Sequence, residues 1–73
     1  EAHFKREMVY AGDSLTGEVY TLTNLTQAEM RLEEREFLAV QGNPIAAIAI
    51  DKHLLKPRES TQVFIIRKVE KQP

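Results

Sequence analysis

The sequence predicts an all-β domain built as a small antiparallel immunoglobulin-like β-sandwich. Its apolar residues recur mostly with a period of two, which is the repeat of side chains on one face of a β-strand. Turn-forming residues separate these runs at short intervals, as in sandwiches made of several short strands. The chain has 73 residues, of which 42% are hydrophobic. Folding a chain of this size buries about 60% of its surface, so one core and one domain are expected.

The first firm strand is predicted over residues 15–24, which are rich in β-branched and aromatic side chains. Tyr20 and Leu22 fall on one face of this strand. Residues 24–27 have the composition of a turn, and the alternation of apolar and charged residues over 28–32 predicts a second strand. We expect this second strand to pair back on the first as a hairpin.

Residues 29–36 leave an alternative open, because they carry six charges in eight positions and this composition also suits a helix. A helix would place Glu36 in its apolar stripe one turn after Leu32, whereas the alternation fits a strand. The strand is therefore favoured for this segment. A single helical turn is still expected over residues 34–38.

Two breaks flank the next predicted strand. Residues 41–44 read Gln-Gly-Asn-Pro and predict a loop. Residues 45–50 follow as a strand with its last two isoleucines on one face and small alanines on the other, as where another element packs close behind the alanines. Residues 54–60 form the second break, in which Pro57 suits the first central position of a turn.

The last strand is predicted over residues 61–67, which are apolar on both faces. Such a strand is an interior one, or one whose outer face a partner covers. A sixth strand over residues 5–10 is an open alternative.

The predicted organisation has three parts. Residues 1–9 are a lead-in or edge strand from a preceding domain, residues 10–68 are the β-sandwich domain, and residues 69–73 are a polar tail. The sequence opens at Glu1 with no initiator methionine and no signal-peptide pattern, so we expect it to be a segment of a longer protein.

Composition disfavours several function classes. Lysine and arginine number 10 against 11 aspartates and glutamates, for a net charge of -1. There is no basic excess to bind phosphates, so no direct binding of nucleic acid is expected. The longest apolar run covers residues 45–50, far short of the roughly 18 residues of a membrane span. Cysteine is absent, which removes disulfides and thiolate nucleophiles.

No set of residues predicts catalysis, a cofactor or a metal site. His3 and His53 are fifty residues apart without any cysteine, whereas structural zinc takes four nitrogen or sulfur ligands at local spacings. Three carboxylates lie close together in the sequence, at Glu33, Glu34 and Glu36, and glycoside hydrolases use carboxylates in pairs. Arginines lie among them, however, and no apolar pocket would raise one pKa above another. We interpret them as a solvated charged turn.

The sequence does predict partner-binding strands. The segment before residue 10 is expected to form a detachable edge, and the strand over 61–67 carries more apolar surface than so small a core needs. A partner's extended segment could then add to a sheet edge and fill alternate pockets. The alternative is that alternate apolar residues of the last strand simply face the second sheet. The predicted partner-binding residues are Lys5, Glu7, Val9, Val63, Ile65 and Arg67.

Several motifs follow one another in a recognisable order: Tyr10-Ala-Gly-Asp-Ser-Leu-Thr-Gly17, Tyr20-Thr-Leu-Thr-Asn24, Leu32-Glu-Glu-Arg-Glu-Phe37, Ile45-Ala-Ala-Ile-Ala-Ile50, Leu54-Leu-Lys-Pro-Arg-Glu-Ser-Thr61 and Val63-Phe-Ile-Ile-Arg67. In this order they resemble the C-terminal domain of TraK, the periplasmic subunit of F-type conjugative type IV secretion systems. The resemblance covers residues 10–67, and its specificity lies in the order of the motifs, since no single one is diagnostic.

The resemblance implies a non-enzymatic building block of the outer-membrane core complex, in the periplasm and associated with the bacterial outer membrane. The implied partners are a TraV-like lipoprotein, a TraB-like core complex subunit and neighbouring copies of the chain itself in a ring that serves DNA transfer. Relatives often have glycine after the turn proline, where this chain has Arg58, so a type I turn is expected. The strand edges also permit another function, an immunoglobulin-like periplasmic chaperone or accessory module that captures extended segments of secreted or pilus proteins.

Overall fold

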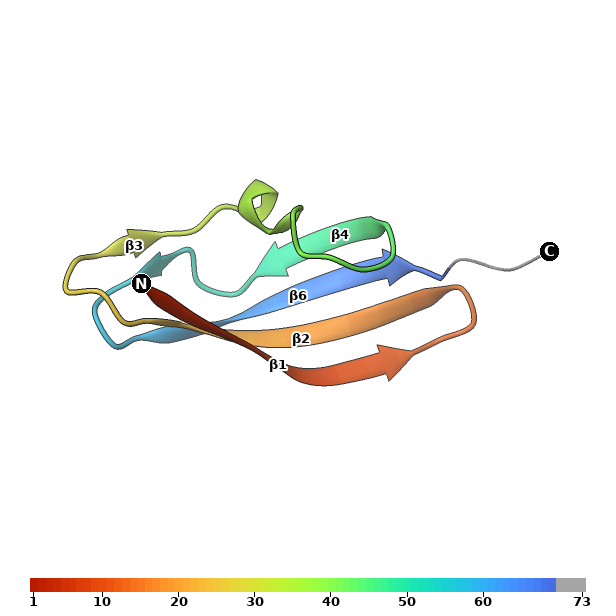
Figure 1. Cartoon of the computed structure of the whole chain (residues 1–73), viewed down its shortest axis with the longest axis horizontal. Helices are drawn as coiled ribbons and strands as arrows, with labels where there is room; N and C mark the ends of the chain where they lie inside the picture. Colours follow the sequence, from red (N-terminus) through yellow and green to blue (C-terminus); the bar gives the residue numbers. More distant parts are fainter. Residues whose placement is uncertain (70–73) are drawn as a thin grey trace.

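The computed structural model describes residues 1–69 and confirms an all-β chain. Six strands and one short 3-10 helix follow along the sequence (Figure 1). Their bounds are β1 Ala2–Ala11, β2 Leu15–Asn24, β3 Met30–Arg31, η1 Glu34–Phe37, β4 Ile45–Ile50, β5 Leu54–Leu55 and β6 Ser60–Lys68. The strands predicted over residues 15–24 and 45–50 are confirmed at the same bounds, and the single helical turn predicted within residues 34–38 is confirmed as η1. The predicted tail lies, from residue 70 onward, outside the described residues.

The strands form one large and one very small sheet. Four antiparallel strands lie in the order β1-β2-β6-β4, and β3 pairs only with β5. An immunoglobulin-like sandwich packs two extended sheets of three or more strands each. The structure does not show such a sandwich, because the second sheet consists of two strands of two residues each within residues 1–69. The coarser prediction of an antiparallel all-β fold is confirmed.

The predicted hairpin between β2 and the following segment is wrong. β2 pairs with β1 on one side and with β6 on the other, so both of its edges are occupied. The chain leaves β2 at Asn24, whose buried amide donates hydrogen bonds to the carbonyl oxygens of Ala28, at 2.9 Å, and Leu55, at 3.0 Å. Its side-chain oxygen accepts a hydrogen bond from the Thr26 backbone at 2.9 Å. This turn carries the chain across to the second layer, where β3 meets β5.

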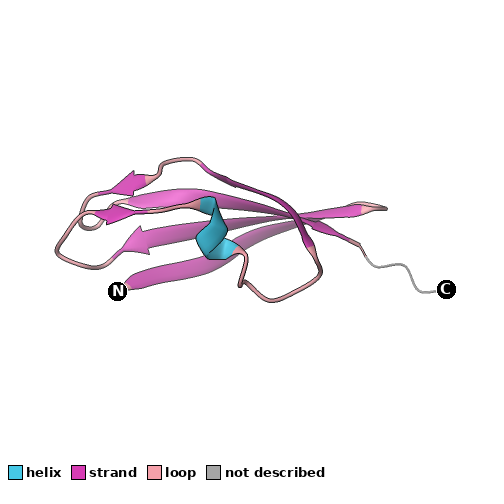
Figure 2. Cartoon of the chain, turned by 90° about the horizontal axis from the view of Figure 1, so that it is seen from above, coloured by secondary structure: helices cyan, strands magenta, loops and turns pink. Residues whose placement is uncertain are grey.

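The core lies between the large sheet and the small second layer. We call the face of the large sheet that contacts this core the inner face, and the opposite face the outer face. Figure 1 and Figure 2 show β3 and β5 over one end of the long strands, with η1 nearer their middle. The buried apolar residues come from both layers and are Tyr20, Leu22, Leu32, Phe37, Ile50, Leu55, Val63 and Ile65.

An aromatic stack closes the core at its β1 side. The ring of Phe4 lies parallel to that of Tyr20 with centroids 4.4 Å apart, and it is tilted against Phe37 at 5.5 Å. Because β1 brings Phe4 to this position, residues before 10 complete the core of the sheet. The strand continues to Ala11, across the predicted boundary at residue 10.

Two local predictions about β4 and the β5–β6 turn are corrected. Ile50 is buried and Ile48 half-buried on the inner face as predicted, but the alanines of β4 are exposed, and no element packs behind them within residues 1–69. Pro57 is confirmed at the first central position of its turn, which closes with a 3.0 Å hydrogen bond from the Glu59 N–H to the Lys56 carbonyl. Arg58, however, has φ 72°, which defines a type II turn and not the expected type I.

Tertiary contacts explain why Arg58 adopts a left-handed conformation. Its backbone N–H donates to the carbonyl oxygen of Asn24 at 2.7 Å, and the Asn24 N–H donates to Glu59 at 2.9 Å. These two bonds tie the turn to the end of β2. They offset the roughly 1–2 kcal/mol that a left-handed conformation costs a residue with a side chain.

Candidate partner-binding surfaces

The edge strand β1 is exposed along its whole length. All ten of its residues are exposed, and it pairs only with β2. Lys5, Glu7 and Val9, three of the predicted partner-binding residues, lie in this strand. An unpaired row of N–H and C=O groups along one side is what an added strand requires.

A β-bulge at Glu7 divides β1 into two halves. Arg6 pairs with Tyr20 before the bulge, and Met8 pairs with Val19 after it. Because directly paired residues share a face, Lys5 belongs to the outer face, whereas Val9, which pairs with Glu18, belongs to the inner face. Bulges twist an edge and limit the length over which another strand can pair. The three predicted residues therefore share a strand but not a face.

The other three predicted residues are buried in the chain itself. Val63 and Ile65 have no exposed surface and face the second layer, and Arg67 is 3% exposed. β6 lies between β2 and β4, so neither of its edges is free. A partner could reach these side chains only if the core opened.

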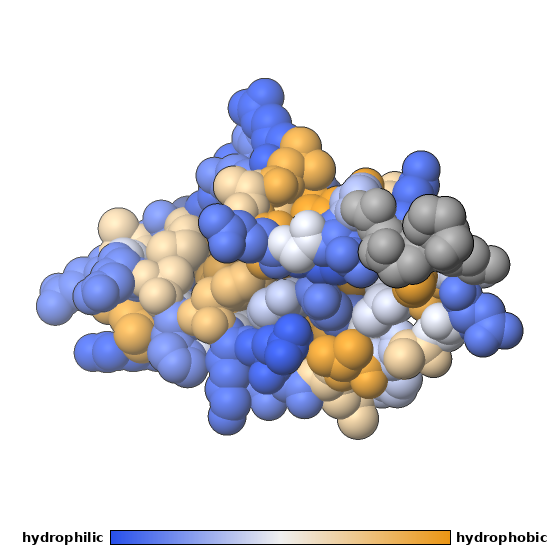
Figure 3. Space-filling view, turned by 45° about the vertical axis from the view of Figure 1, so that its right-hand side comes forward, coloured by the Kyte–Doolittle hydropathy of each residue, from blue (hydrophilic) through white to orange (hydrophobic). Residues whose placement is uncertain are grey.

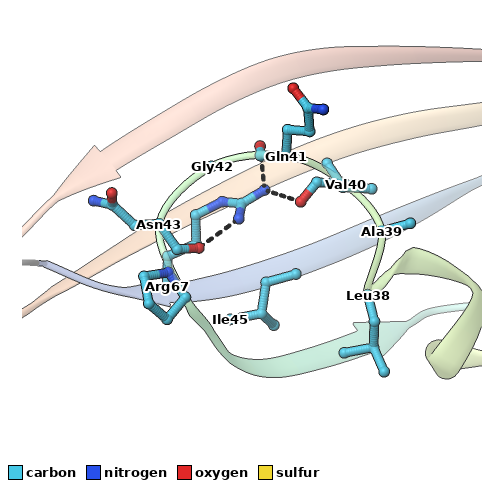
Figure 4. A pocket seen from close by; sticks show the side chains of 9 residues that line it. Leu38, Ala39, Val40, Gln41, Gly42, Asn43, Ile45 and Arg67 are labelled. Carbon is cyan, nitrogen blue, oxygen red and sulfur yellow. Dashed lines mark hydrogen bonds between the residues drawn. The ribbon is translucent and has the colours of Figure 1, made fainter.

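Arg67 instead forms a buried polar cluster, which we call the Arg67 cluster. Its Nε lies 3.0 Å from Oε1 of Glu18, and the Tyr20 hydroxyl donates to the same oxygen at 2.7 Å. The remaining guanidinium nitrogens donate to the carbonyl oxygens of Val40 at 3.3 Å, Gln41 at 3.1 Å and Asn43 at 2.7 Å (Figure 4). One side chain thus ties the loop after η1 to the two central strands of the large sheet, β2 and β6.

Hydrogen bonding keeps the buried carboxylate charged. Burial alone would raise the pKa of Glu18, but hydrogen bonds from Tyr20 and Arg67, with the positive charges of Arg67 and Arg6, bring this pKa below its ordinary value of 4.5. Burial and the neighbouring carboxylate raise the pKa of Tyr20 above its ordinary value. At neutral pH the cluster is therefore a salt bridge with a neutral phenol donating to it.

Gly42 allows the loop to approach the guanidinium. Its φ of 145° is disfavoured for residues with a side chain, and a Cβ there would lie 2.8 Å from Cζ of Arg67. The loop lines an open pocket of about 590 Å³ around this side chain. Because the guanidinium already bonds Glu18 and three loop carbonyls, we interpret the pocket as part of the loop anchor.

The sequence carried a signal for this cluster that the prediction missed. Glu18 alternates in register with Tyr20 and Leu22, and Arg67 alternates with Val63 and Ile65. The inner-facing positions of β2 therefore include one negative charge, and those of β6 include one positive charge. Two such charges on inner faces indicate a buried pair, since isolated buried charges are strongly disfavoured.

The acidic residues around η1 make local contacts. Glu33 pairs with Arg35 at 2.9 Å, Glu36 accepts a 2.9 Å hydrogen bond from the Glu33 N–H, and Glu34 contacts His53 at 2.6 Å. The hydrogen bond from His53 lowers the pKa of the exposed Glu34. Within residues 1–69, no group of three histidine, aspartate or glutamate side chains could hold a metal ion.

The fold defines a small all-β module with a long exposed edge strand and an internally satisfied polar cluster. Residues 1–67 match the family model described as the TraK C-terminal domain, and the chain belongs to that family. This membership confirms the resemblance seen in the sequence. No curated protein matches the chain.

Family membership implies a role in conjugative type IV secretion. TraK domains are structural components of the secretion complex and are not known as enzymes. The family also suggests a periplasmic location. No helix within the described residues is long and apolar enough to cross a membrane.

Proposed function

We propose that this domain is a building block of the outer-membrane core complex of a conjugative type IV secretion system. In this proposal it binds a TraV-like lipoprotein, contacts a TraB-like core subunit and adjoins neighbouring copies of itself in a ring. The observation that carries the proposal is a ten-residue edge strand, every residue of which is exposed, on a domain of the TraK family. Such a strand can receive an extended segment of a partner by main-chain hydrogen bonding.

We assign the lipoprotein segment to the half of β1 that follows the bulge. Here Val9 is 48% exposed and pairs with Glu18, beside the Arg67 cluster. The bulge at Glu7 gives this half a fixed end, which would set the register of an added strand. Lys5 lies before the bulge and would contact flanking residues of the same partner.

The proposal is tested by co-purification of the lipoprotein with the full-length subunit from an envelope fraction. Val9→Asp places a charge in the proposed contact, and Leu54→Asp is the matched control, because Leu54 is similarly exposed at 43% but lies in β5. We expect the β1 variant to lose the lipoprotein while the control retains it, with both variants correctly folded. Retention of the lipoprotein by both variants would contradict the assignment to β1.

The chaperone alternative differs in what happens to the bound protein. A scaffold remains in a complex of fixed composition that survives detergent extraction, whereas a chaperone releases its client. The structural role that the family implies favours the scaffold. A complex whose partner turns over during a chase experiment would instead favour the chaperone.

A further inference from the structure

The outer face of the large sheet carries an apolar patch that the core does not use. Two neighbouring rows of residues run across all four strands in register. One row is Met8, Val19, Phe64 and Ala49, and the next is Tyr10, Gly17, Ile66 and Ala47. We call these eight residues the outer patch.

The outer patch faces solvent, with its four residues on β1 and β4 exposed and its four residues on β2 and β6 half-buried. The second layer and the loop held by Arg67 both pack on the inner face, so no element within residues 1–69 covers the patch. Met8 is 53% exposed and Tyr10 is 58% exposed. Seen toward the end where β1 connects to β2, the surface shows apolar areas between hydrophilic ones (Figure 3).

Beyond the Met8 side of the outer patch, the same face is polar, as a solvated sheet surface should be. The row beyond Met8 contains Thr21 and Gln62, and the row after that contains Thr23 and Ser60, whose hydroxyls are 2.7 Å apart. A solvent-facing side of an antiparallel sheet is normally polar in this way. The apolar half therefore requires an explanation, and a contiguous exposed apolar patch commonly marks an interaction site.

The size of the outer patch favours one element over a whole domain. Four strands and two side-chain rows, with the spacings of a regular sheet, give a footprint of about 250 Å². A stable interface between two proteins buries about 800 Å² on each side, so face-to-face packing of a second copy on this patch alone would be too small. An α-helix is about 10 Å wide, which matches two rows.

The chemistry of a sheet face favours a helix over an extended segment. A strand satisfies its backbone only at a sheet edge, whereas a helix satisfies its backbone internally and needs only an apolar surface. Lys5 lies on this face at one end of the patch, and Lys68, which pairs with Leu15, lies at the other. Glu7 is in the bulge, and Asp51 follows β4 at one corner. A helix that crosses the strands would thus have a lysine on each flank.

We propose that the outer patch binds one amphipathic helix of a partner protein, whose apolar stripe is flanked by acidic residues. Gly17 lies between Tyr10 and Ile66 in one row of the outer patch and has no side chain, so the surface of the sheet is lower there. The proposal concerns the face of the sheet and not the edge of β1. It goes beyond the proposed function and needs no lipoprotein.

The test uses the full 73-residue chain and synthetic helical peptides of about four turns, or about 14 residues. The first peptide carries a leucine stripe flanked by glutamates. The second has the same composition in an order that breaks the stripe, and the third replaces the glutamates with lysines. In an NMR titration we expect the first peptide to shift signals of Tyr10, Val19 and Phe64. We expect the other two to bind about tenfold more weakly or not at all.

Tyr10→Thr removes an exposed ring and retains a residue suited to strands. We expect it to weaken the first peptide about tenfold, as loss of a central aromatic contact does, and Met8→Thr provides an independent variant of the same patch. Leu54→Thr, at a similarly exposed residue of β5, is the matched control and should not change the affinity. Unchanged melting temperatures show that each variant is folded.

Three results would overturn the proposal. The first is equal binding of all three peptides, or no binding of any. The second is a set of shifted signals confined to the β1 edge or to the second layer. The third is self-association of the chain without peptide that Tyr10→Thr abolishes, since this would make a second copy the occupant. None of these results depends on lipoprotein co-purification, so the proposed function would stand or fall separately.

Discussion

The two ends of the inner face are closed in different ways. At the end under β3 and β5, the second layer covers the sheet with apolar side chains such as Leu55, which has no exposed surface. At the end where β1 connects to β2, the loop of residues 38–44 covers the sheet, and the contact is made by Arg67 and loop carbonyls. Apolar packing needs only fitting shapes, but a buried charge needs every partner in place. The first end, which we call the apolar end, therefore supplies stability. The second, which we call the polar end, fixes the position of one loop.

Val63→Asp should have the largest effect, because it introduces a charge into the apolar end. Burying an unpaired carboxylate there costs several kcal/mol, which is comparable with the total stability of about 4–11 kcal/mol expected for a domain of this size. We expect the variant to be unfolded at room temperature in circular dichroism. Phe64→Asp is the control, since Phe64 is the next residue and lies on the outer face. Equal loss of structure in both variants would show that the two faces are assigned incorrectly.

Arg67→Met should have the second largest effect and tests the polar end. The variant leaves Glu18 buried without its cation, and breaking a buried ion pair in this way costs about 3–5 kcal/mol. The stability is measured by urea denaturation. In the double variant Glu18→Leu with Arg67→Met, no charge remains unpaired, and we expect part of the loss to be recovered. A double variant less stable than the Arg67 single variant would contradict the view that the pair acts as a unit.

Gly42→Ala should have a smaller effect that is confined to the loop. The substitution combines an unfavourable φ with a close contact to the guanidinium, and we expect a loss of about 1–2 kcal/mol. The NMR signal of the Arg67 Nε–H reports whether the hydrogen bond to Glu18 survives. Gln41→Ala is the control, because Gln41 is exposed in the same loop and contributes only its carbonyl oxygen. Equal stability loss in both would mean that the backbone conformation at Gly42 is unimportant.

The sequence predicts the local elements of the fold better than the long-range pairing between them. β2 and β4 were predicted at their correct bounds because alternation and adjacent turn residues are local signals. The partner of β3 could not be predicted, because a two-residue strand carries little pattern and its position depends on Asn24 bonding to Leu55. For the same reason, the sequence did not indicate that the second sheet would consist of only two short strands.

The partner-binding residues show the same difference between local and long-range signals. The exposed position of β1 follows from a charged segment at the start of the sheet, but the bulge at Glu7, which separates Lys5 from Val9, has no clear local signature. Inward-facing charges on two strands could have indicated the Arg67 cluster. The pairing of Glu18 with a residue 49 positions away, however, depends on the register of β2 and β6.

Acid should produce the smallest effect and should act on the polar end. The pKa of Glu18 is lower in the folded state than its ordinary value of 4.5, so the unfolded chain binds a proton first as the pH falls. The stabilisation from this group is therefore complete above about pH 4.5 and is lost as the pH falls through the folded pKa. Glu34 and Glu59 also have lowered pKa values but are exposed and contribute weakly.

The Glu18→Gln variant isolates this contribution. We expect the difference in free energy of unfolding between the unmodified chain and the variant to be constant near neutral pH and to shrink below pH 4.5. Urea denaturation at a series of pH values measures that difference. If it were independent of pH down to pH 3, Glu18 would not be the ionised partner of Arg67. The polar end would then be held by the loop carbonyls alone, and the contrast between the two ends would be one of hydrogen bonding and not of charge.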